Sequence, residues 1–183
     1  MHILYLHQYF CPPDGSGGTR SYEIASRLVK AGHSVTLITS SAFFPETYNI
    51  NKTANIIIDG INITILYIPY SNKMSKYQRI WAFIKFSLLS TIYSIKQKNV
   101  GLTFATSTPL TIIIPGYIAS RFFNVPLVFE VRDLWPDLPI AIGAIKSRFV
   151  IKLSKTMEAF AYSRANKIIA LSPGIKDEII KKA

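Results

Sequence analysis

The sequence predicts a doubly wound α/β domain, and three observations lead to this prediction. Hydrophobic runs without polar alternation, such as Leu127-Val128-Phe129 and Ile168-Ile169-Ala170-Leu171, are typical of a parallel sheet buried on both faces. Helical segments separate these strands, as parallel strand connections require. The length of 183 residues fits one compact unit. We therefore expect residues 1–183 to form a single domain with a mostly parallel sheet.

The first half of the chain contains a helix and a hairpin with clear local signals. Ile24, Leu28 and Val29 lie on one side of the helix, and Gly32 follows its end. Asp59-Gly60 separates two apolar runs, which is typical of a β-hairpin turn. The expected elements are the strand Ile3–Leu6, the helix Thr19–Lys30, the strand Val35–Thr39, a polar loop 40–55, and hairpin arms Asn55–Asp59 and Asn62–Ile68.

The second half alternates helices and strands down to the last residues. Pro109 precedes one expected helix and Pro173 begins the last, as is common in the first turn. The expected elements are a helix over 77–98, the strand Leu102–Ala105, the helix Leu110–Phe123, the strand Leu127–Val131, the helix Lys146–Arg164, the strand Lys167–Leu171 and the helix Pro173–Lys182.

Composition excludes several protein classes. Hydrophobic residues make up 49% of the chain and charged residues 17%, so disordered and collagen-like proteins are excluded. Cys11 is the single cysteine and has no internal disulfide partner, and no Cys/His cluster has the spacing of a zinc site. The run Ile80–Ile95 contains Lys85 and is short for a membrane span, and the N-terminus lacks the pattern of an export signal. We expect a cytoplasmic protein without a metal or other cofactor.

The net charge of +11 is concentrated in part of the chain. Residues 1–60 contain four basic and four acidic side chains, whereas residues 61–129 contain seven basic and no acidic ones. Residues 130–183 contain ten basic and six acidic side chains. A surface of this charge favours an anionic partner: a phosphoanhydride, an acidic lipid or a nucleic acid.

The helix 77–98 is a candidate for the membrane-facing element. Ser87, Ser90, Ser94 and Gln97 form a narrow polar stripe, and apolar residues cover the rest of the helix. With lysines near both ends, segment 73–98 is predicted to dock on an anionic membrane surface. The alternative is a helix buried between the sheet and a second domain.

Ligands of such folds bind beyond the carboxyl ends of the strands, so those loops hold the candidate site residues. The first loop contains Gly17 and Gly18 just before a helix, which is typical of phosphate binding. Arg20 stands where the dinucleotide motif G-x-G-x-x-G requires its third glycine, so a nicotinamide cofactor is disfavoured. A loop whose glycines serve only its turns is the alternative.

Three more strand ends contain polar candidates. Arg132 and Asp133 follow a buried strand and are expected in the crevice, unless Arg132 forms a structural network with Asp133 or Glu130. Ser107 and Thr108 are either ligand-binding hydroxyls or caps of the next helix. His7 lies at a strand's carboxyl end. His2, His33 and Cys11 are expected to have no chemical role.

Several segments resemble the N-terminal half of family 4 glycosyltransferases. The resemblance rests on the Gly17-Gly18 pair, on Arg20–Leu28 and on Ala31–Thr36. Glu130–Asp137 and Ala170–Gly174 are similar to the branch that builds bacterial cell-envelope polysaccharides, including amino-sugar transferases that act on polyprenyl-diphosphate sugars. Such enzymes have the GT-B fold of two Rossmann-like domains, so the resemblance implies an acceptor-side domain here and a donor-binding domain that lies outside this chain.

The resemblance also implies roles for individual residues. Gly17 and Gly18 would cover the diphosphate of a nucleotide-sugar donor, with Arg20 nearby. Arg132-Asp133 stands where many members have a His-Asp pair, so these two are the expected catalytic residues. The implied enzyme retains anomeric configuration without a metal and transfers sugar to a lipid-linked sugar acceptor. The residues expected to line the acceptor pocket are His7, Ser107, Thr108 and Glu130.

Two other classes of function compete with this one. A membrane-surface or partner-binding module without catalysis is favoured by the basic, apolar stretch 73–98. Nucleic-acid binding is suggested only by the isoelectric point of about 9.8, and no recognised motif accompanies it. Whatever the function, loop 15–20 and Arg132-Asp133 are predicted to line one crevice, because both follow parallel strands at the same sheet edge.

Overall fold

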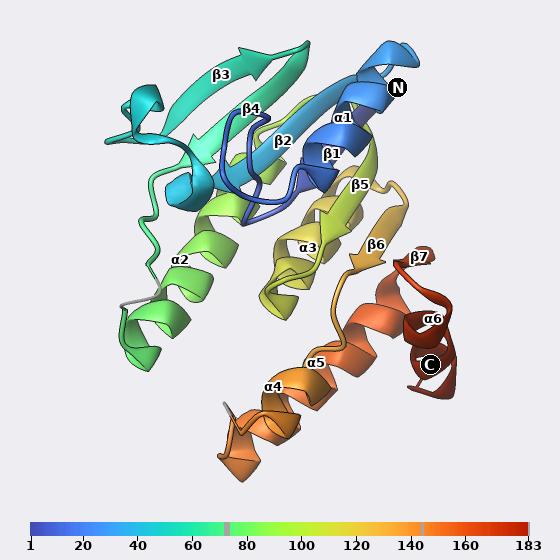
Figure 1. Ribbon diagram of the computed structural model, residues 1–183. Coiled ribbons are helices and arrows are strands. Elements are labelled where there is room, and N and C mark those ends of the chain that lie inside the picture. The colour runs from blue at the N-terminus through green and yellow to red at the C-terminus, as the bar shows by residue number, and fades with distance from the viewer. Residues whose placement is uncertain (72–73, 144, 183) are drawn as a thin grey trace.

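A seven-stranded sheet runs through the protein in the order β3-β4-β2-β1-β5-β6-β7 (Figure 1). The computed structural model describes residues 1–71, 74–143 and 145–182, so Lys73 and the side chain of Lys76 lie outside the described part of the chain. The strands are β1 (His2–Leu6), β2 (Ser34–Ser40), β3 (Ala54–Ile58), β4 (Ile61–Leu66), β5 (Val100–Thr106), β6 (Leu127–Val131) and β7 (Lys167–Ala170). Of the paired strands, β3 and β4 run antiparallel and the others run parallel.

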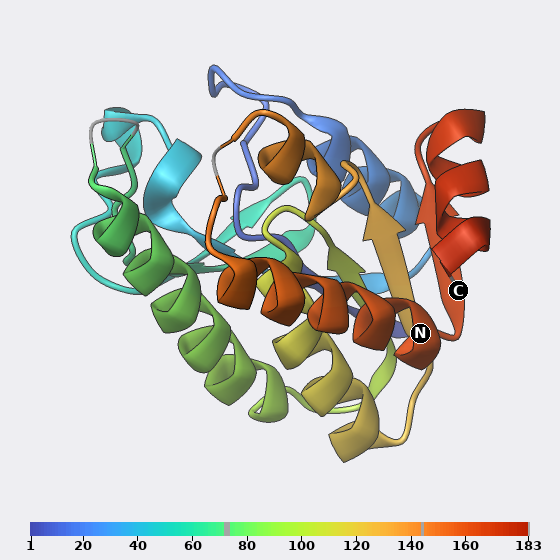
Figure 2. The same ribbon diagram turned by 90° about the horizontal axis from the view of Figure 1, so that it is seen from below.

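Helices cover both faces of this sheet, which confirms the doubly wound α/β prediction. The helices are α1 (Arg20–Lys30), α2 (Lys76–Ile95), α3 (Ile113–Phe123), α4 (Asp137–Ala141), α5 (Arg148–Arg164) and α6 (Pro173–Lys182), with short 3-10 helices η1 (Ser41–Phe43), η2 (Glu46–Tyr48) and η3 (Leu110–Ile112). Helix α1 lies on one face, and α2, α3 and α5 lie on the other, nearest the viewer in Figure 2.

The central strand β1 shows why its sequence is continuously apolar. Leu4 and Leu6 point into the core beneath α2 and α3, whereas Ile3 and Tyr5 point into the core beneath α1. Both sets are fully or almost fully buried. A strand with helices on both faces has no solvent-facing side, so polar alternation is absent.

Most predicted elements are present, with bounds that differ by a few residues. The hairpin turn is confirmed: Asp59 and Gly60 have φ angles of 47° and 78°, the left-handed pair that a tight hairpin requires. The predicted polar loop 40–55 contains η1 and η2. The helix expected from Leu110 begins as the 3-10 helix η3, and the helix expected from Lys146 begins at Arg148.

Helix α4 was not predicted. It has five residues with Pro139 among them, so it shows no helical periodicity in the sequence. Tertiary contacts hold it, because Lys182 of α6 forms an ion pair with Asp137 at its start and another, at 2.8 Å, with Glu158 of α5. The loop after β6 is thereby attached to the last two helices.

Helix α2 turns its polar stripe inward. Ser87, Ser90 and Ser94 are buried against the domain, and Ser90 Oγ donates to the Phe86 carbonyl at 2.6 Å. Trp81 and Leu88 point outward, with 64% and 60% of their surface exposed. Small serines allow close approach to α3 and the sheet, and the Ser90 hydroxyl is satisfied within the helix itself. The apolar ridge is left facing out.

Replacing Ser90 with Leu tests this inward packing. The larger side chain has no space, so we expect Ser90→Leu to lower the free energy of unfolding by ~1–3 kcal/mol in urea titrations followed by circular dichroism. Leu88→Gln on the exposed side should change the same quantity by less than ~0.5 kcal/mol. Equal effects of the two substitutions would contradict the orientation of α2.

Candidate functional site

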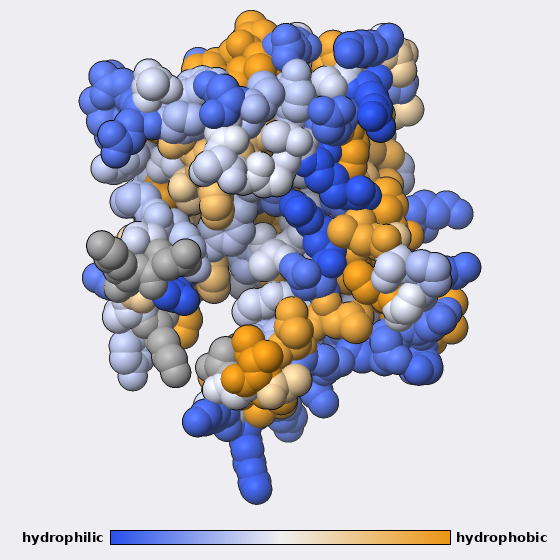
Figure 3. Space-filling model, viewed as in Figure 1, coloured by the Kyte–Doolittle hydropathy of each residue, from blue (hydrophilic) through white to orange (hydrophobic). Residues whose placement is uncertain are grey.

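A hollow of about 460 Å³ lies at the carboxyl edge of the sheet. Its lining residues come from loops that follow several of the strands: His7, Tyr9, Gly17, Gly18, Phe43, Tyr70, Thr108, Arg132, Asp133 and Leu171. The glycine loop and Arg132-Asp133 therefore meet in one crevice, as the topology predicted. Figure 3 shows the surface around this edge, where hydrophobic atoms gather over α4 at the lower end of the molecule; Leu138 and Ile142 are exposed there.

Arg132 is held from two sides. Its backbone N–H donates to Ser107 Oγ at 3.0 Å, and its guanidinium Nη1 lies 3.3 Å from His7 Nε2. Burial, and then the charge of Arg132, lowers the pKa of His7 to about 3. His7 is therefore neutral at physiological pH, and Nε2 accepts from the guanidinium because arginine only donates. Its proton then sits on Nδ1, which has no hydrogen-bond partner among the described residues.

Asp133 is oriented by a hydroxyl rather than by Arg132. Thr108 Oγ1 donates to Asp133 Oδ2 at 2.8 Å, which leaves Oδ1 with the capacity to accept from a ligand hydroxyl. No ion pair joins Arg132 to Asp133 or to Glu130 in the described ranges, so the alternative network around Arg132 is wrong. Ser107 and Thr108 do not cap the next helix either, since η3 has no side-chain cap.

Glu130 and Arg20 form a pair behind the pocket instead of lining it. Arg20 Nε donates to Glu130 Oε1 at 2.8 Å, and Thr106 Oγ1 donates to Oε2 at 3.0 Å. Glu130 is fully buried, whereas 44% of the Arg20 side chain is exposed. A buried carboxylate needs such partners, because an unpaired one costs several kcal/mol. The sequence predicts that both residues contact ligand, but neither is among the residues that line the hollow. The role of Arg20 at the diphosphate stays a prediction.

The glycine loop folds around Cys11. A side chain at Gly15 would place its Cβ 2.4 Å from Cys11 Sγ, and the Gly17 N–H donates to that sulfur at 3.1 Å. Gly18 has more space, because a Cβ at this position would lie 3.9 Å from Arg132 Nη2, an ordinary contact distance. A side chain at Gly15 would thus collide with the buried cysteine, one at Gly17 would be tight with its Cβ 3.1 Å from Cys11 Sγ, and Gly18 lies beside the Arg132 guanidinium.

Sequence reasoning missed the aromatic wall of the pocket. Tyr9 lies 5.5 Å from Phe43 and 5.2 Å from Tyr70 between ring centroids, and Tyr70 stacks on Phe83 at 6.4 Å. Tyr9 and Phe43 lie in two loops that topology had already selected. An aromatic residue in a strand-end loop was the available signal, but aromatic side chains are so common in this chain that it did not stand out.

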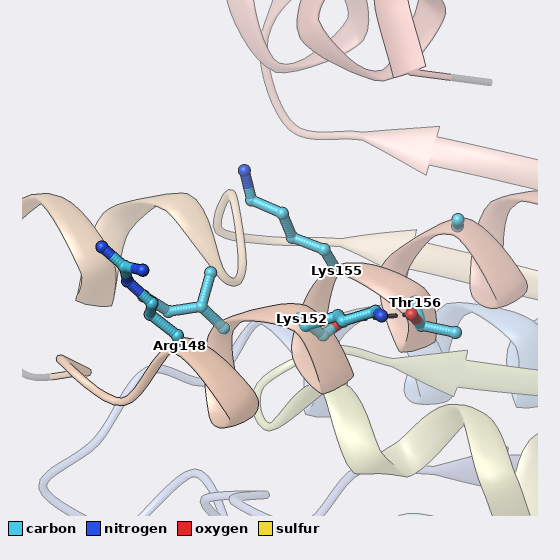
Figure 4. Close-up of a pocket in the computed structure, with 6 residues that line it drawn as sticks. Arg148, Lys152, Lys155 and Thr156 are labelled. Carbon is cyan, nitrogen blue, oxygen red and sulfur yellow. Dashed lines mark hydrogen bonds between the residues drawn. The ribbon is translucent and has the colours of Figure 1, made fainter.

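A second hollow lies along α5 (Figure 4). Arg148, Lys152 and Lys155 line it, and every lining residue belongs to this one helix. It is therefore an exposed, cationic helix face. No group of His, Cys, Asp or Glu that suits a metal ion occurs in the described part of the chain. The described helices also include none with the length and hydropathy of a membrane span.

Solved structures with the same fold have low sequence identity to this chain. A structure described as trehalose-6-phosphate from E. coli bound with UDP-2-fluoro glucose aligns with a TM-score of 0.60 and 8% identity. Anabaena Alr3699/HepE in complex with UDP and glucose aligns with a TM-score of 0.53 and 17% identity. A UDP-N-acetylglucosamine 2-epimerase aligns with a TM-score of 0.53 and 8% identity.

These alignments cover 100% of this chain but only 42%, 41% and 45% of the three structures, in the same order. The chain thus spans less than half of each relative. No curated protein matches the sequence. The model of the glycosyl transferase 4-like domain matches residues 15–183. This range includes Gly17, Gly18, Arg132 and Asp133 of the pocket. The chain belongs to the glycosyl transferase 4-like domain family.

Proposed function

We propose that this chain is the acceptor-side half of a retaining, nucleotide-sugar-dependent glycosyltransferase. The observation that carries the proposal is the division of one pocket into two poles, a cationic one at Gly18 and Arg132 and a hydroxyl-binding one at Thr108 and Asp133. Two of the structural relatives were solved with UDP-sugar or with UDP and glucose, which supports a nucleotide-sugar donor. The proposed acceptor is a sugar on polyprenyl diphosphate, in cell-envelope polysaccharide synthesis.

The cationic pole would stabilise the departing diphosphate. As the sugar–phosphate bond breaks, negative charge grows on the leaving oxygen, and fixed donors aimed at that charge lower the barrier. Arg132 supplies guanidinium N–H groups, and Gly18 offers a backbone that a ligand can approach without a side chain between them. His7 and Ser107 hold Arg132 in place, so its orientation is set before the substrate arrives. We assign this role to protein groups and propose no cofactor.

The hydroxyl-binding pole would orient the acceptor sugar. Asp133 accepts from Thr108 on one oxygen and can accept a sugar hydroxyl on the other. In front-face transfer with retention, the leaving diphosphate itself takes the acceptor's proton, so a second carboxylate as general base is not required. Asp133 then acts by positioning the reacting groups.

The outward face of α2 supports docking at an anionic membrane, with the protein at the inner face of the cytoplasmic membrane. Tyr77, Trp81, Ile84 and Leu88 are exposed along this helix, and residues 61–129 contain no acidic side chain to repel anionic lipid. Helices α2 and α5 lie on the same face of the sheet (Figure 2), so the cations of α5 reinforce that charge. The same observations favour the alternative, a membrane-surface or partner-binding module without catalysis.

Activity of the complete enzyme distinguishes the two functions. Asp133→Asn should lower the turnover of sugar transfer ~10-fold or more, because a neutral amide replaces a charged hydrogen-bond acceptor. Transfer is measured from a panel of labelled sugar nucleotides to a polyprenyl-diphosphate sugar. Asp177→Asn on exposed α6 is the matched control and should leave turnover unchanged. Failure of all donors to support transfer would favour the non-catalytic module.

Residues 1–183 alone should bind sugar nucleotides weakly. The pocket is partly open to water, which weakens every electrostatic contact within it. We expect a dissociation constant near 1 mM, or about 4 kcal/mol of binding free energy, in calorimetry with UDP-glucose and UDP-N-acetylglucosamine. Micromolar binding, or measurable transfer, would show that this half holds the donor by itself.

Membrane docking is tested on the outward ridge of α2. The double variant Trp81→Gln, Leu88→Gln removes two large exposed side chains from the helix, so flotation with vesicles rich in anionic phospholipid should fall at least threefold at low salt. The control is Ile57→Gln, Ile180→Gln, which removes two exposed isoleucines on β3 and α6. Equal flotation of both variants and the parent would exclude α2 as the docking element.

A further inference from the structure

Three aromatic rings line the pocket wall and have no role in the transfer chemistry. Tyr9 comes from the loop after β1, Phe43 from η1 after β2, and Tyr70 from the segment after β4. Phe43 is one of the lining residues, and 40% of its surface is exposed. Water contact with an aromatic ring is unfavourable, so a ligand with an apolar face would gain from covering it.

The rings form a corner. Tyr9 and Phe43 meet at 83°, with Tyr70 tilted against Tyr9 at 58° and stacked on Phe83 at 21°. Burial raises the pKa of Tyr9, so its phenol stays uncharged. The same pocket also holds the Thr108–Asp133 pair, which offers hydroxyl-binding oxygens. The pocket therefore combines an apolar corner with a carboxylate that can accept hydrogen bonds from ligand hydroxyls.

We propose that Tyr9, Phe43 and Tyr70 form a subsite for one pyranose ring of the acceptor. The C–H groups of the sugar ring would rest on the aromatic faces, and its hydroxyls would reach Asp133. This inference rests on the proposed function, since it assigns to the acceptor sugar the part of the pocket that the leaving diphosphate does not use.

A nucleobase is the other neutral ligand that stacks on aromatic rings, and the geometry disfavours it. A flat base lies against one ring face, whereas two rings meeting at 83° do not provide a flat slot. A chair-shaped pyranose has C–H groups along its face and its edge and can contact both rings of the corner. The subsite is therefore assigned to a sugar.

Saturation-transfer NMR on residues 1–183 tests the subsite. The probes are methyl glycosides of glucose, galactose, mannose and N-acetylglucosamine, with uridine as the nucleobase probe. We expect at least one glycoside to receive saturation on its ring C–H protons. The signal should fall at least threefold in Phe43→Leu and in Tyr70→Leu, and Tyr70→Phe, which keeps the ring, should restore it.

Phe122→Leu is the matched control, because it removes an exposed ring from α3, outside the pocket, and should leave the signal unchanged. Phe43→Leu is the deciding variant where Tyr70→Leu impairs folding, since Phe43 is partly exposed. Loss of signal in Phe122→Leu equal to that in Phe43→Leu would overturn the subsite, as would displacement of the glycoside by uridine. So would the absence of any glycoside signal. These outcomes do not depend on the transfer assay of the complete enzyme. The subsite proposal can therefore fail while the proposed function stands, and the reverse also holds.

Discussion

The buried carboxylate of Glu130 is the constraint on which the site depends. It lies near the end of β6 inside the protein, where an unpaired charge is not tolerated, and Arg20 and Thr106 bind its two oxygens. Arg20 is the first residue of α1, so this pair attaches the end of the glycine loop to β6. Arg132 follows Glu130 by two residues. The loop that presents Gly18 and the strand that presents Arg132 are therefore held together by one ion pair.

This pair also explains why Arg132 can serve a ligand. Glu130 accepts from Arg20, and Asp133 accepts from Thr108. The two carboxylates nearest to Arg132 along the chain therefore have other partners. The guanidinium contacts a neutral imidazole, which positions it without cancelling its charge. A positive charge held this way at the end of a strand suits an anionic leaving group, and a neutralised one would not.

The inward packing of the α2 serines also determines which side of α2 faces solvent. Serines of α2 pack inward beside Phe86, and Ser90 satisfies its hydroxyl within the helix. Other large apolar side chains of α2, among them Trp81 and Leu88, are left exposed. Helix α2 lies on the face of the sheet opposite α1, as α5 does (Figure 2). The pocket opens instead at the sheet's carboxyl edge. The surface proposed to meet the membrane and the site proposed to bind sugar are therefore built from different elements, and each can be altered separately.

Sequence alone determined the elements whose signals are local. The buried strands, the Asp59-Gly60 turn, the helix starts at proline and the position of Arg132-Asp133 after β6 all follow from short-range patterns in the chain. Tertiary structure decided which groups meet. Arg20 and Glu130 are 110 residues apart, so no local pattern shows that Glu130 pairs with Arg20 rather than Arg132. The inward turn of the α2 serines and the joining of the aromatic residues into one wall likewise depend on which surfaces the folded chain brings into contact.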